Sequence, residues 1–174
     1  ARSLAVEVSV PTVLDADALT AIGVDLDMLR QAQGPRVLTP HPGEAGRLLG
    51  CPSAEVQADR YGAARELASR AGHPVVLKGA RTVVAASSGL LRVNRRGTPA
   101  LAVAGTGDVL AGVIAALLAT VEPLDAASVG VCLHAVAGER AARGDRGLLA
   151  REVASAIPGV LHECHGSAGG TATG

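Results

Sequence analysis

The residues best suited to chemistry lie at the start of a long apolar segment, in the stretch Gly105-Thr106-Gly107-Asp108. A helix begins with free backbone N–H groups and a partial positive charge, so glycines there favour an anion close to the backbone. Phosphoryl transfer needs such amides for its charge and a base for the proton of the attacking hydroxyl. We therefore interpret the amides of residues 105–108 as an anion site and Asp108 as the base.

A simpler interpretation of the same stretch has equal weight. Thr106 could cap the helix, and Asp108 could merely complement its dipole. The stretch is not a Walker loop, because no lysine follows, and Leu110 stands where a dinucleotide fingerprint needs glycine. The helix that follows is apolar on all sides, which predicts that it is buried.

A second group of polar residues follows the apolar segment "RVLTP" in "HPGEAGRLLG". Pro42 suits the first position of a helix, so His41 and Glu44 would lie between a strand end and a helix start. Ligands of open α/β sheets bind at the carboxyl ends of strands. His41 could contact a substrate there and Glu44 could hold a hydrated metal ion. Alternatively, Glu44 only stabilises the helix start.

Two further strand ends carry charged residues. Lys78 follows "PVVL" and precedes Gly79, where it could reach a phosphate as a point charge or be a solvated turn lysine. Asp15 and Asp17 follow a short strand at residues 12–14 and could bind substrate hydroxyls or a metal. Alternatively, one of them simply starts the next segment. His134 lies in an apolar helix, and we expect a core histidine whose hydrogen bonds are satisfied. The tail motif "HECH" is not taken as a zinc site.

The elements that must position these residues alternate along the chain. Apolar segments at 12–14, 36–40 and 74–79 read as strands, and "RTVVAASSGLLRVN" reads as a hairpin turning at Ser87-Ser88-Gly89. Helices are expected at 25–34, 42–50, 53–72 (with Ser53 as its cap), from Gly105 onward, at 125–143 and at 148–157. This order predicts one α/β domain over residues 1–162, with a largely parallel sheet and a disordered tail at 163–174.

Composition excludes several classes of partner. Lysine plus arginine and aspartate plus glutamate each number 16, and Tyr61 is the one aromatic residue. A neutral chain without aromatic stacking platforms is a poor nucleic-acid binder. The most apolar segment is too short to span a bilayer comfortably, so no membrane partner is expected. Three scattered cysteines without a CxxC pair suit the reducing cytoplasm.

Taken together, the motifs resemble the ADP/ATP-dependent NAD(P)H-hydrate dehydratase family of the ribokinase-like superfamily. The resemblance runs from Val13 to Pro158, with "VLDADAL", "LTPHPGEAGRLLG", "VVLKGARTVVA", "AVAGTGDVLAGVIAALLA", "LHAVAGERAA" and "GLLAREVASAIP" in the family's order. It implies a ribokinase-like fold, a mostly parallel central sheet flanked by helices. It also implies nicotinamide-nucleotide repair. Such enzymes phosphorylate the S-epimer of hydrated NADH or NADPH, and loss of phosphate restores the double bond and leaves AMP or ADP.

The resemblance also assigns roles at matching positions. Asp108 matches the base and a hydrate contact, His41 matches a hydrate contact, and Glu44 matches the acid that organises Mg²⁺ through water. Asp15 joins them as a candidate substrate contact from its strand-end position. The anion hole matches Gly105, Thr106 and Gly107. The nucleotide site matches Lys78, Gly79, Ala80, Arg81, Thr82 and Gly107. ADP is the expected phosphoryl donor, with ATP as the alternative.

The front of the family's domain has no counterpart in this sequence, since further N-terminal strands and helices carry part of its hydrate pocket. We therefore expect either the C-terminal part of a longer enzyme or a chain that is inactive alone. Two other functions stay open: a ribokinase-like kinase of a small alcohol such as a vitamin precursor, and a non-catalytic nucleotide-binding or assembly module. A homo-oligomer is expected, as is fusion to, or cooperation with, an NAD(P)H-hydrate epimerase.

Overall fold

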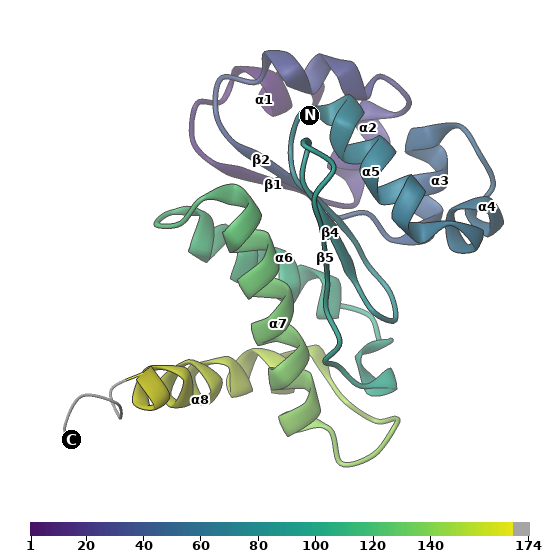
Figure 1. Cartoon of the computed structure of the whole chain (residues 1–174). Helices are drawn as coiled ribbons and strands as arrows, with labels where there is room; N and C mark the ends of the chain where they lie inside the picture. Colours follow the sequence, from purple (N-terminus) through teal and green to yellow (C-terminus); the bar gives the residue numbers. More distant parts are fainter. Residues whose placement is uncertain (169–174) are drawn as a thin grey trace.

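The computed structural model describes residues 1–168 and is built on one five-stranded sheet (Figure 1). The strands lie in chain order: β1(Thr12–Leu14), β2(Arg36–Leu38), β3(Val75–Leu77), β4(Val83–Ala85) and β5(Leu91–Val93). The pairs β1–β2 and β2–β3 are parallel, and β3–β4 and β4–β5 are antiparallel. The predicted strands are therefore present. The predicted hairpin turn is present too, since Ala86 N–H donates to the Leu90 carbonyl around Gly89.

Helices cover both faces of this sheet, as Figure 1 shows. The first half of the chain supplies α1(Arg2–Glu7), α2(Asp17–Ile22), the 3-10 helix η1(Leu26–Gln31), α3(Pro42–Leu49), α4(Ser53–Ala58) and α5(Arg60–Ala71). The second half supplies the 3-10 helix η2(Pro99–Leu101), α6(Thr106–Leu118), α7(Pro123–Ala141) and α8(Ala150–Ala168). Helix α5 packs on β3 and β4 from one side, while α6 and α7 contact β1, β2 and β4. Helix α8 packs across α7 and projects from the body.

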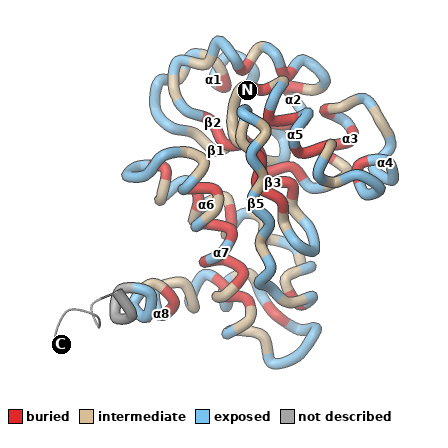
Figure 2. The backbone as a smooth tube through the Cα atoms, in the orientation of Figure 1, coloured by how far each residue is buried: buried red, intermediate tan, exposed pale blue. Residues whose placement is uncertain are grey.

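Alternation along the short strands divides the core between these two layers. In β3, Val75 and Leu77 join the cluster under α2, α3 and α5, whereas Val76 joins the cluster under α6 and α7. Val84 in β4 likewise faces the second cluster, between two neighbours that face the first. Successive strand side chains point to opposite faces, so a strand buried on both faces reads as a continuous apolar run. Figure 2 shows this as buried backbone along the sheet and its facing helices.

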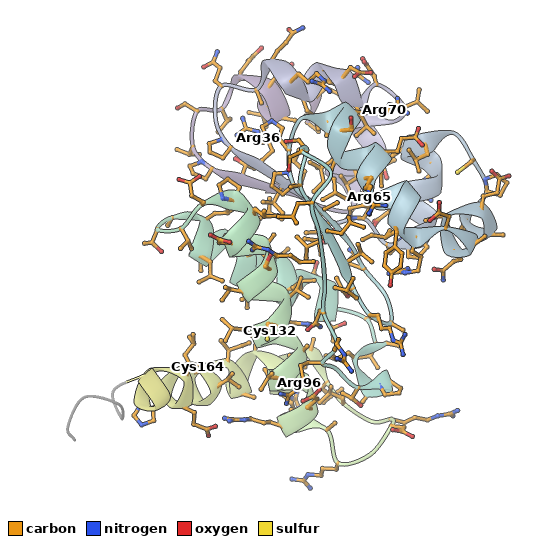
Figure 3. All side chains as sticks on the ribbon, in the orientation of Figure 1. Arg36, Arg65, Arg70, Arg96, Cys132 and Cys164 are labelled. Atoms are coloured by element: carbon orange, nitrogen blue, oxygen red, sulfur yellow. The ribbon has the colours of Figure 1, made fainter. Side chains whose placement is uncertain are left out.

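Helix α1 was not anticipated from the sequence, where no helix was expected before β1. The guanidinium of Arg36 explains its position, because it is fully buried and donates to the carbonyls of Ala5, Val8 and Val10. Figure 3 labels Arg36 near the N-terminal end of the molecule. Burial lowers the pKa of Arg36. A buried cation needs such hydrogen bonds, so these residues fold back over the start of β2.

The expected single helix at 53–72 is two helices, α4 and α5, which is a correction. Asp59 separates them, and its side chain accepts a hydrogen bond from Gly62 N–H at 2.8 Å, which caps α5. Ser53 is the first residue of α4 and not its cap, since Pro52 holds that position. Short polar side chains such as aspartate compete for backbone donors and favour helix starts. The apolar face was predicted correctly: Val56, Ala63, Leu67 and Ala71 are buried.

The apolar helix α6 is buried on one face only, contrary to expectation. Leu110, Ile114 and Leu118 are buried, whereas Gly112 and the pair at 115–116 are exposed. The exposed positions carry glycine and alanine, which expose little apolar surface, so the helix tolerates solvent there. No helix in the described part of the chain is long and apolar enough to cross a membrane.

The end of the chain also differs from the expected boundary at 162. Helix α8 continues to Ala168, so the first residues assigned to a disordered tail are helical. Glu163 forms an ion pair with Arg140 of α7, which ties this part of α8 to its neighbour. The shift to small polar residues therefore did not mark the helix end. The rest of the expected tail, 169–174, lies outside the described residues.

Candidate active site

Three neighbouring strand ends bring one lysine and two carboxylates together. Lys78 Nζ, after β3, lies 2.7 Å from Asp15 Oδ1, after β1, and 3.7 Å from Glu44 Oε2, which follows β2 in α3. All three side chains are largely buried, at 19%, 16% and 7% exposure. Parallel strands present their carboxyl ends at one edge, which is why residues 63 positions apart meet. Asp17 is not part of this cluster, since it is exposed and begins α2.

His41 and Glu44 hold each other at the start of α3. The Nδ1 atom of His41 accepts from the amides of Gly43 and Glu44, and Glu44 Oε2 accepts from His41 N–H at 2.7 Å. This reciprocal capping box satisfies free amides at the helix start and fixes both side chains. The capping role that we left open for Glu44 is therefore present, together with its contact to Lys78. The His41 side chain is half exposed, and its Nε2 atom lies 3.5 Å from Glu44 Oε1.

The first turn of α6 lies beside Lys78. A Cβ placed on Gly107 would lie 3.6 Å from Lys78 Nζ, so the ammonium adjoins the helix start. Gly105 is the N-cap, with φ +84° in the left-handed region, and a Cβ there would lie 3.1 Å from Ala150 Cβ. Both facts favour glycine at this position. Asp108 is in the first turn and exposed.

Thr106 does not cap α6, contrary to one interpretation of the sequence. Its hydroxyl donates to the carbonyls of Leu101 and Val103, at 2.8 and 2.9 Å, so it fastens η2 and the following loop to the helix. The backbone amides at the start of α6 are therefore not capped by the Thr106 side chain, and the anion-site interpretation of residues 105–108 stays a prediction.

A cavity of about 500 Å³ lies beside this turn. Its walls come from the segment after β3, the loop after β5, and the facing sides of α6 and α7. The lining residues that the sequence predicts for phosphate or nucleotide binding are Lys78, Gly79, Ala80, Arg81, Thr82, Thr106 and Gly107. Gly79 has φ +133° and Arg81 has φ +54°, so the backbone turns sharply along the wall. The volume suits a ligand of nucleotide size. Asp15, His41, Glu44 and Asp108 do not line this cavity.

Sequence reasoning missed Arg60, which braces the cavity wall from α5. Its Nη2 atom donates to the carbonyls of Leu77 and Lys78, at 3.1 and 3.3 Å, directly before Gly79. Burial lowers the pKa of Arg60. A charged guanidinium on two carbonyls fixes the backbone that presents the Lys78 side chain. The only available signal was an arginine immediately after the Asp59 helix cap, which is too common to indicate a role.

A second missed residue is Glu139 of α7, which shapes the opposite wall. It accepts from Arg96 Nε at 3.0 Å and from the Gly97 amide, and the Arg96 hydrogen bond lowers the pKa of Glu139. Asn94 closes the same loop by bonding the amide and carbonyl of Arg96. Figure 3 shows Arg96 beside α7, far from Arg36. Residues 94–97 of this wall are therefore held at both ends, by Asn94 within the loop and by Glu139 from α7.

His134 of α7 also lines the cavity, and it departs from expectation. The residue is buried, as predicted for a core histidine. Its Nε2 atom, however, has no hydrogen-bond partner among the described residues. Burial lowers the pKa of His134, against the smaller effect of a hydrogen bond with the Thr106 backbone. The expected full satisfaction of this ring is therefore wrong.

The sequence model of the NAD(P)H-hydrate dehydratase family matches residues 2–159. This chain belongs to that family. The match covers every candidate site residue, and it confirms the resemblance drawn from the motifs. It does not test the role of any single residue, so the residue assignments remain predictions.

Curated relatives in the NAD(P)H-hydrate dehydratase family agree with this assignment. The ADP-dependent (S)-NAD(P)H-hydrate dehydratase of Neisseria meningitidis is 46% identical over 152 residues, which cover 84% of this chain and 51% of that protein. The bifunctional NAD(P)H-hydrate repair enzyme Nnr of Moorella thermoacetica is 45% identical over 163 residues, covering 92% of this chain and 31% of the relative. The chain thus spans about a third to a half of these relatives.

A solved structure confirms the fold class. The ADP/ATP-dependent NAD(P)H-hydrate dehydratase of Bacillus subtilis, co-crystallised with ATP and Mg²⁺ and soaked with CoA, superposes with a TM-score of 0.82 at 35% identity. The match covers 91% of this chain and 58% of that protein. The sheet, its antiparallel hairpin and the flanking helices are therefore those of a dehydratase-family domain.

Proposed function

We propose that this chain carries the phosphoryl-transfer centre of an ADP- or ATP-dependent NAD(P)H-hydrate dehydratase, which restores NADH or NADPH from the S-epimer of its hydrate. One observation carries the proposal. The first turn of α6, with Gly107 beside Lys78 and Asp108 next in sequence, stands at the mouth of a nucleotide-sized cavity. Membership of the family and the names of the two relatives support the same reaction.

The nucleotide would lie along the cavity wall formed by residues 78–82. Its phosphates would meet the amides of residues 105–107 and the Lys78 ammonium. Arg81 and Thr82 line the same wall and complete the nucleotide-binding stretch with Gly79 and Ala80. Helix-start amides and a point charge together stabilise the charge that develops on a transferring phosphoryl group.

Asp108 would act as the base. Its carboxylate takes the proton of the hydrate hydroxyl while the hydroxyl oxygen attacks the terminal phosphorus of ADP, and the bond to AMP breaks. The new phosphate ester then loses phosphate with the electrons of its C–O bond, and the ring nitrogen supplies an electron pair. Loss of a ring proton restores the double bond. The amides of Gly105, Thr106 and Gly107 would hold the oxygens of the group in transit.

The substrate hydroxyl would approach from the side of the strand ends. His41 presents a half-exposed ring there, and Asp15 lies against Lys78. We assign His41 to contact with the hydrate. Asp15 is assigned to the same side, with the added task of orienting the ammonium.

Mg²⁺ is proposed as the metal, held through water by Glu44. The described residues contain no group of three or more histidine, cysteine, aspartate or glutamate side chains that could hold an ion. A single carboxylate such as that of Glu44 fits Mg²⁺, because this ion often keeps several waters and binds through one or two carboxylates and the substrate phosphates. When bound, the ion would neutralise phosphate charge. The Glu44 side chain is held in place for this task by the hydrogen bond that it accepts from His41 N–H.

The decisive experiment incubates the chain with hydrated NADH, ADP and Mg²⁺ and follows the NADH absorbance band. Recovery of the band, with one AMP and one phosphate released per NADH, would support the proposal. Replacing ADP by ATP in a parallel reaction measures the donor preference, and we expect ADP to be faster. No recovery, combined with phosphorylation of an added small alcohol, would favour the ribokinase-like kinase instead.

The Asp108→Asn substitution tests the role of Asp108 as the base separately from nucleotide binding. The variant should lose most turnover, about 10²- to 10⁴-fold, because general base catalysis contributes on that scale. Nucleotide affinity, measured by calorimetry, should change little. Unchanged turnover would refute Asp108 as the base. If the unmodified chain binds ADP without turning over, while a longer gene product used as positive control is active, the non-catalytic module is the better description.

The expected homo-oligomer and the partnership with an epimerase stay predictions. The Moorella thermoacetica relative is named bifunctional, and this chain matches 31% of it. Chromatography with light scattering would measure the oligomeric state directly.

A further inference from the structure

The cavity beside the α6 turn has a cationic lining. Among the described residues, four of its lining side chains are cationic and none is a carboxylate. The four are Lys78, Arg81, Arg95 and Arg96. Lys78 is balanced by the two carboxylates at the strand ends, and Arg96 forms an ion pair with Glu139 of α7. The lining therefore suits an anionic ligand, and the other two charges lack a counter-ion.

Arg81 and Arg95 are these two unbalanced cavity arginines. Neither side chain forms an ion pair or a hydrogen bond within residues 1–168. In contrast, Arg92 and Arg96, which stand close to Arg95 in the chain, are both paired with carboxylates of α7. The guanidiniums of Arg81 and Arg95 are therefore available to a ligand in the cavity.

The end of the β4–β5 hairpin brings the two arginines together. The strand pairing continues one residue beyond the strands, because Asn94 N–H donates to the Thr82 carbonyl at 2.9 Å. Arg81 and Arg95 are the next residues outward on the two chains. Like charges that face each other across neighbouring strands are destabilising. An anion bound here would relieve that repulsion.

The backbone of Arg81 is strained as well. Its φ is +54°, in the left-handed region where any side chain other than glycine costs free energy. Such strain gathers at ligand-binding positions, where the surrounding structure holds it in place. The backbone at this position suits glycine, so the arginine found there calls for a functional explanation.

A phosphate group meets these requirements. The planar guanidinium presents paired N–H donors that match phosphate oxygens. In the proposed function, the transferred phosphoryl group lies at the α6 turn beside Lys78. The phosphate that stays on the nucleotide becomes a monoester when the bond to the transferred group breaks, and it then carries about two negative charges. Two unbalanced guanidiniums match that charge.

We propose that Arg81 and Arg95 bind the phosphate that the nucleotide keeps, which is the α-phosphate of ADP, and so stabilise AMP as it leaves. The inference rests on the proposed function, because it takes the cavity as the nucleotide site. It divides the cations of the cavity between two phosphates, with Lys78 at the transferred group and the arginine pair at the leaving group. Positive charge at both groups stabilises the charge that develops during the transfer.

The test measures dissociation constants for AMP, ADP and adenosine, with the weakly bound adenosine measured by competition. In Arg95→Met, the constants for AMP and ADP should rise about tenfold, as expected for a lost charged hydrogen bond. Adenosine, which has no phosphate, should keep its affinity. Arg95→Lys keeps the charge without the paired donors and should recover part of the loss.

Arg47→Met is the matched control, because it removes one positive charge from an exposed position of α3. Helix α3 packs on the face of the sheet opposite to α6 and α7, and Arg47 does not line the cavity. AMP affinity should be unchanged in this variant. An equal loss in Arg47→Met and Arg95→Met would overturn the inference, since it would reflect net charge alone.

Arg81→Gly separates ligand binding from stability. Glycine relieves the left-handed strain, so the melting temperature should rise, while the affinity for AMP should fall about tenfold. A variant that merely damaged the fold would lower both. Unchanged AMP affinity in Arg81→Gly and Arg95→Met would overturn the inference, as would an equal loss for AMP and adenosine. If adenosine binds too weakly for a constant, the AMP constants of the arginine variants decide. Failure of the unmodified protein to bind either AMP or ADP would instead contradict the proposed function, and the inference with it.

Discussion

The ion pair between Lys78 and Asp15, with Nζ and Oδ1 2.7 Å apart, joins the end of β3 to the end of β1 across the strand between them. Glu44, following β2, is the second carboxylate of the group. One ammonium thus balances two largely buried carboxylates at the edge where the α6 turn begins. The position of the Lys78 ammonium between the two carboxylates depends on the order of the strands and not on any local sequence pattern.

Replacing Lys78 should damage both binding and stability. In Lys78→Met, nucleotide phosphates lose a point charge, and we expect the dissociation constant for ADP to rise at least tenfold. The two carboxylates lose their counter-ion, so the free energy of unfolding should fall by about 1–3 kcal/mol. Calorimetry and urea denaturation measure the two effects.

The double variant Asp15→Asn/Lys78→Met shows whether the pair is coupled. If the ion pair accounts for the loss, the double variant should be more stable than the sum of the single changes implies, by about 0.5–3 kcal/mol. Strict additivity of the stability changes would mean that the contact contributes no energy of its own.

Gly105→Ala should destabilise the protein by about 1–2 kcal/mol, since a side chain at φ +84° is strained and meets Ala150 Cβ. Gly112→Ala, in the same helix, is the matched control because its Cβ would meet nothing within 4 Å. This substitution should stabilise α6 by about 0.5–1 kcal/mol through helix propensity. Thermal denaturation of both variants checks the pair. Equal shifts of the same sign would contradict the role assigned to Gly105.

Arg60→Met should weaken nucleotide binding although Arg60 is not among the cavity-lining residues. Losing the charged hydrogen bonds to the Leu77 and Lys78 carbonyls should cost about 1.5–3 kcal/mol of stability and loosen the wall after β3. Arg65→Met on the same helix is the control, because its exposed side chain donates to the Gly89 carbonyl, its one hydrogen-bond partner among residues 1–168. Arg65 is labelled in Figure 3. Its stability should stay within about 0.5 kcal/mol of the original. A similar loss in both variants would argue against bracing by Arg60.

His73 should make stability fall in mild acid. Burial lowers its pKa below the ordinary value of 6.5, with Arg36 acting in the same direction against the hydrogen bond to Leu29. The unfolded chain therefore binds the proton more readily, so stability is complete above pH 6.5 and is lost as the pH falls through the folded-state pKa. Urea denaturation between pH 8 and 5 should show a slope of at most about 1.4 kcal/mol per pH unit for this group.

His73→Gln should reduce that pH dependence. A remaining slope is expected from His134, whose pKa is also lowered by burial. An identical pH profile in the variant and the original protein would show that His73 contributes nothing to the acid sensitivity.

The site residues that could be predicted from the sequence share one property. Asp15, His41 and Lys78 follow apolar strand segments, and Glu44 stands in the first turn of the helix after the second segment, so strand ends and parallel topology predict that they converge. The Gly105 turn was found because a glycine-rich turn before a helix is a local pattern. These inferences need only neighbouring residues and the rule that ligands lie at the carboxyl edge of a parallel sheet.

Long-range hydrogen bonds account for most of what was missed. Arg60 bonds carbonyls 17 and 18 residues away, and Arg36 bonds carbonyls up to 31 residues away. Neither contact leaves a local signal, because any backbone carbonyl can accept. The exposed side of α6 was missed because hydropathy counts alanine and glycine as apolar whether or not anything covers them. Asp59 split a helix since its capping bond outweighed the apolar periodicity across it.

Ala150 of α8 lies close to the turn at Gly105, because a Cβ on Gly105 would come within 3.1 Å of Ala150 Cβ. Ala150 is the first residue of α8, and among the described side chains of that helix none lines the cavity. It nevertheless limits how far the N-cap of α6 can move. In the proposed mechanism the stiffness of the turn at Gly105 would therefore depend on how firmly a peripheral helix docks on α7, and partial detachment of α8 is expected to slow the proposed phosphoryl transfer while the sheet stays intact.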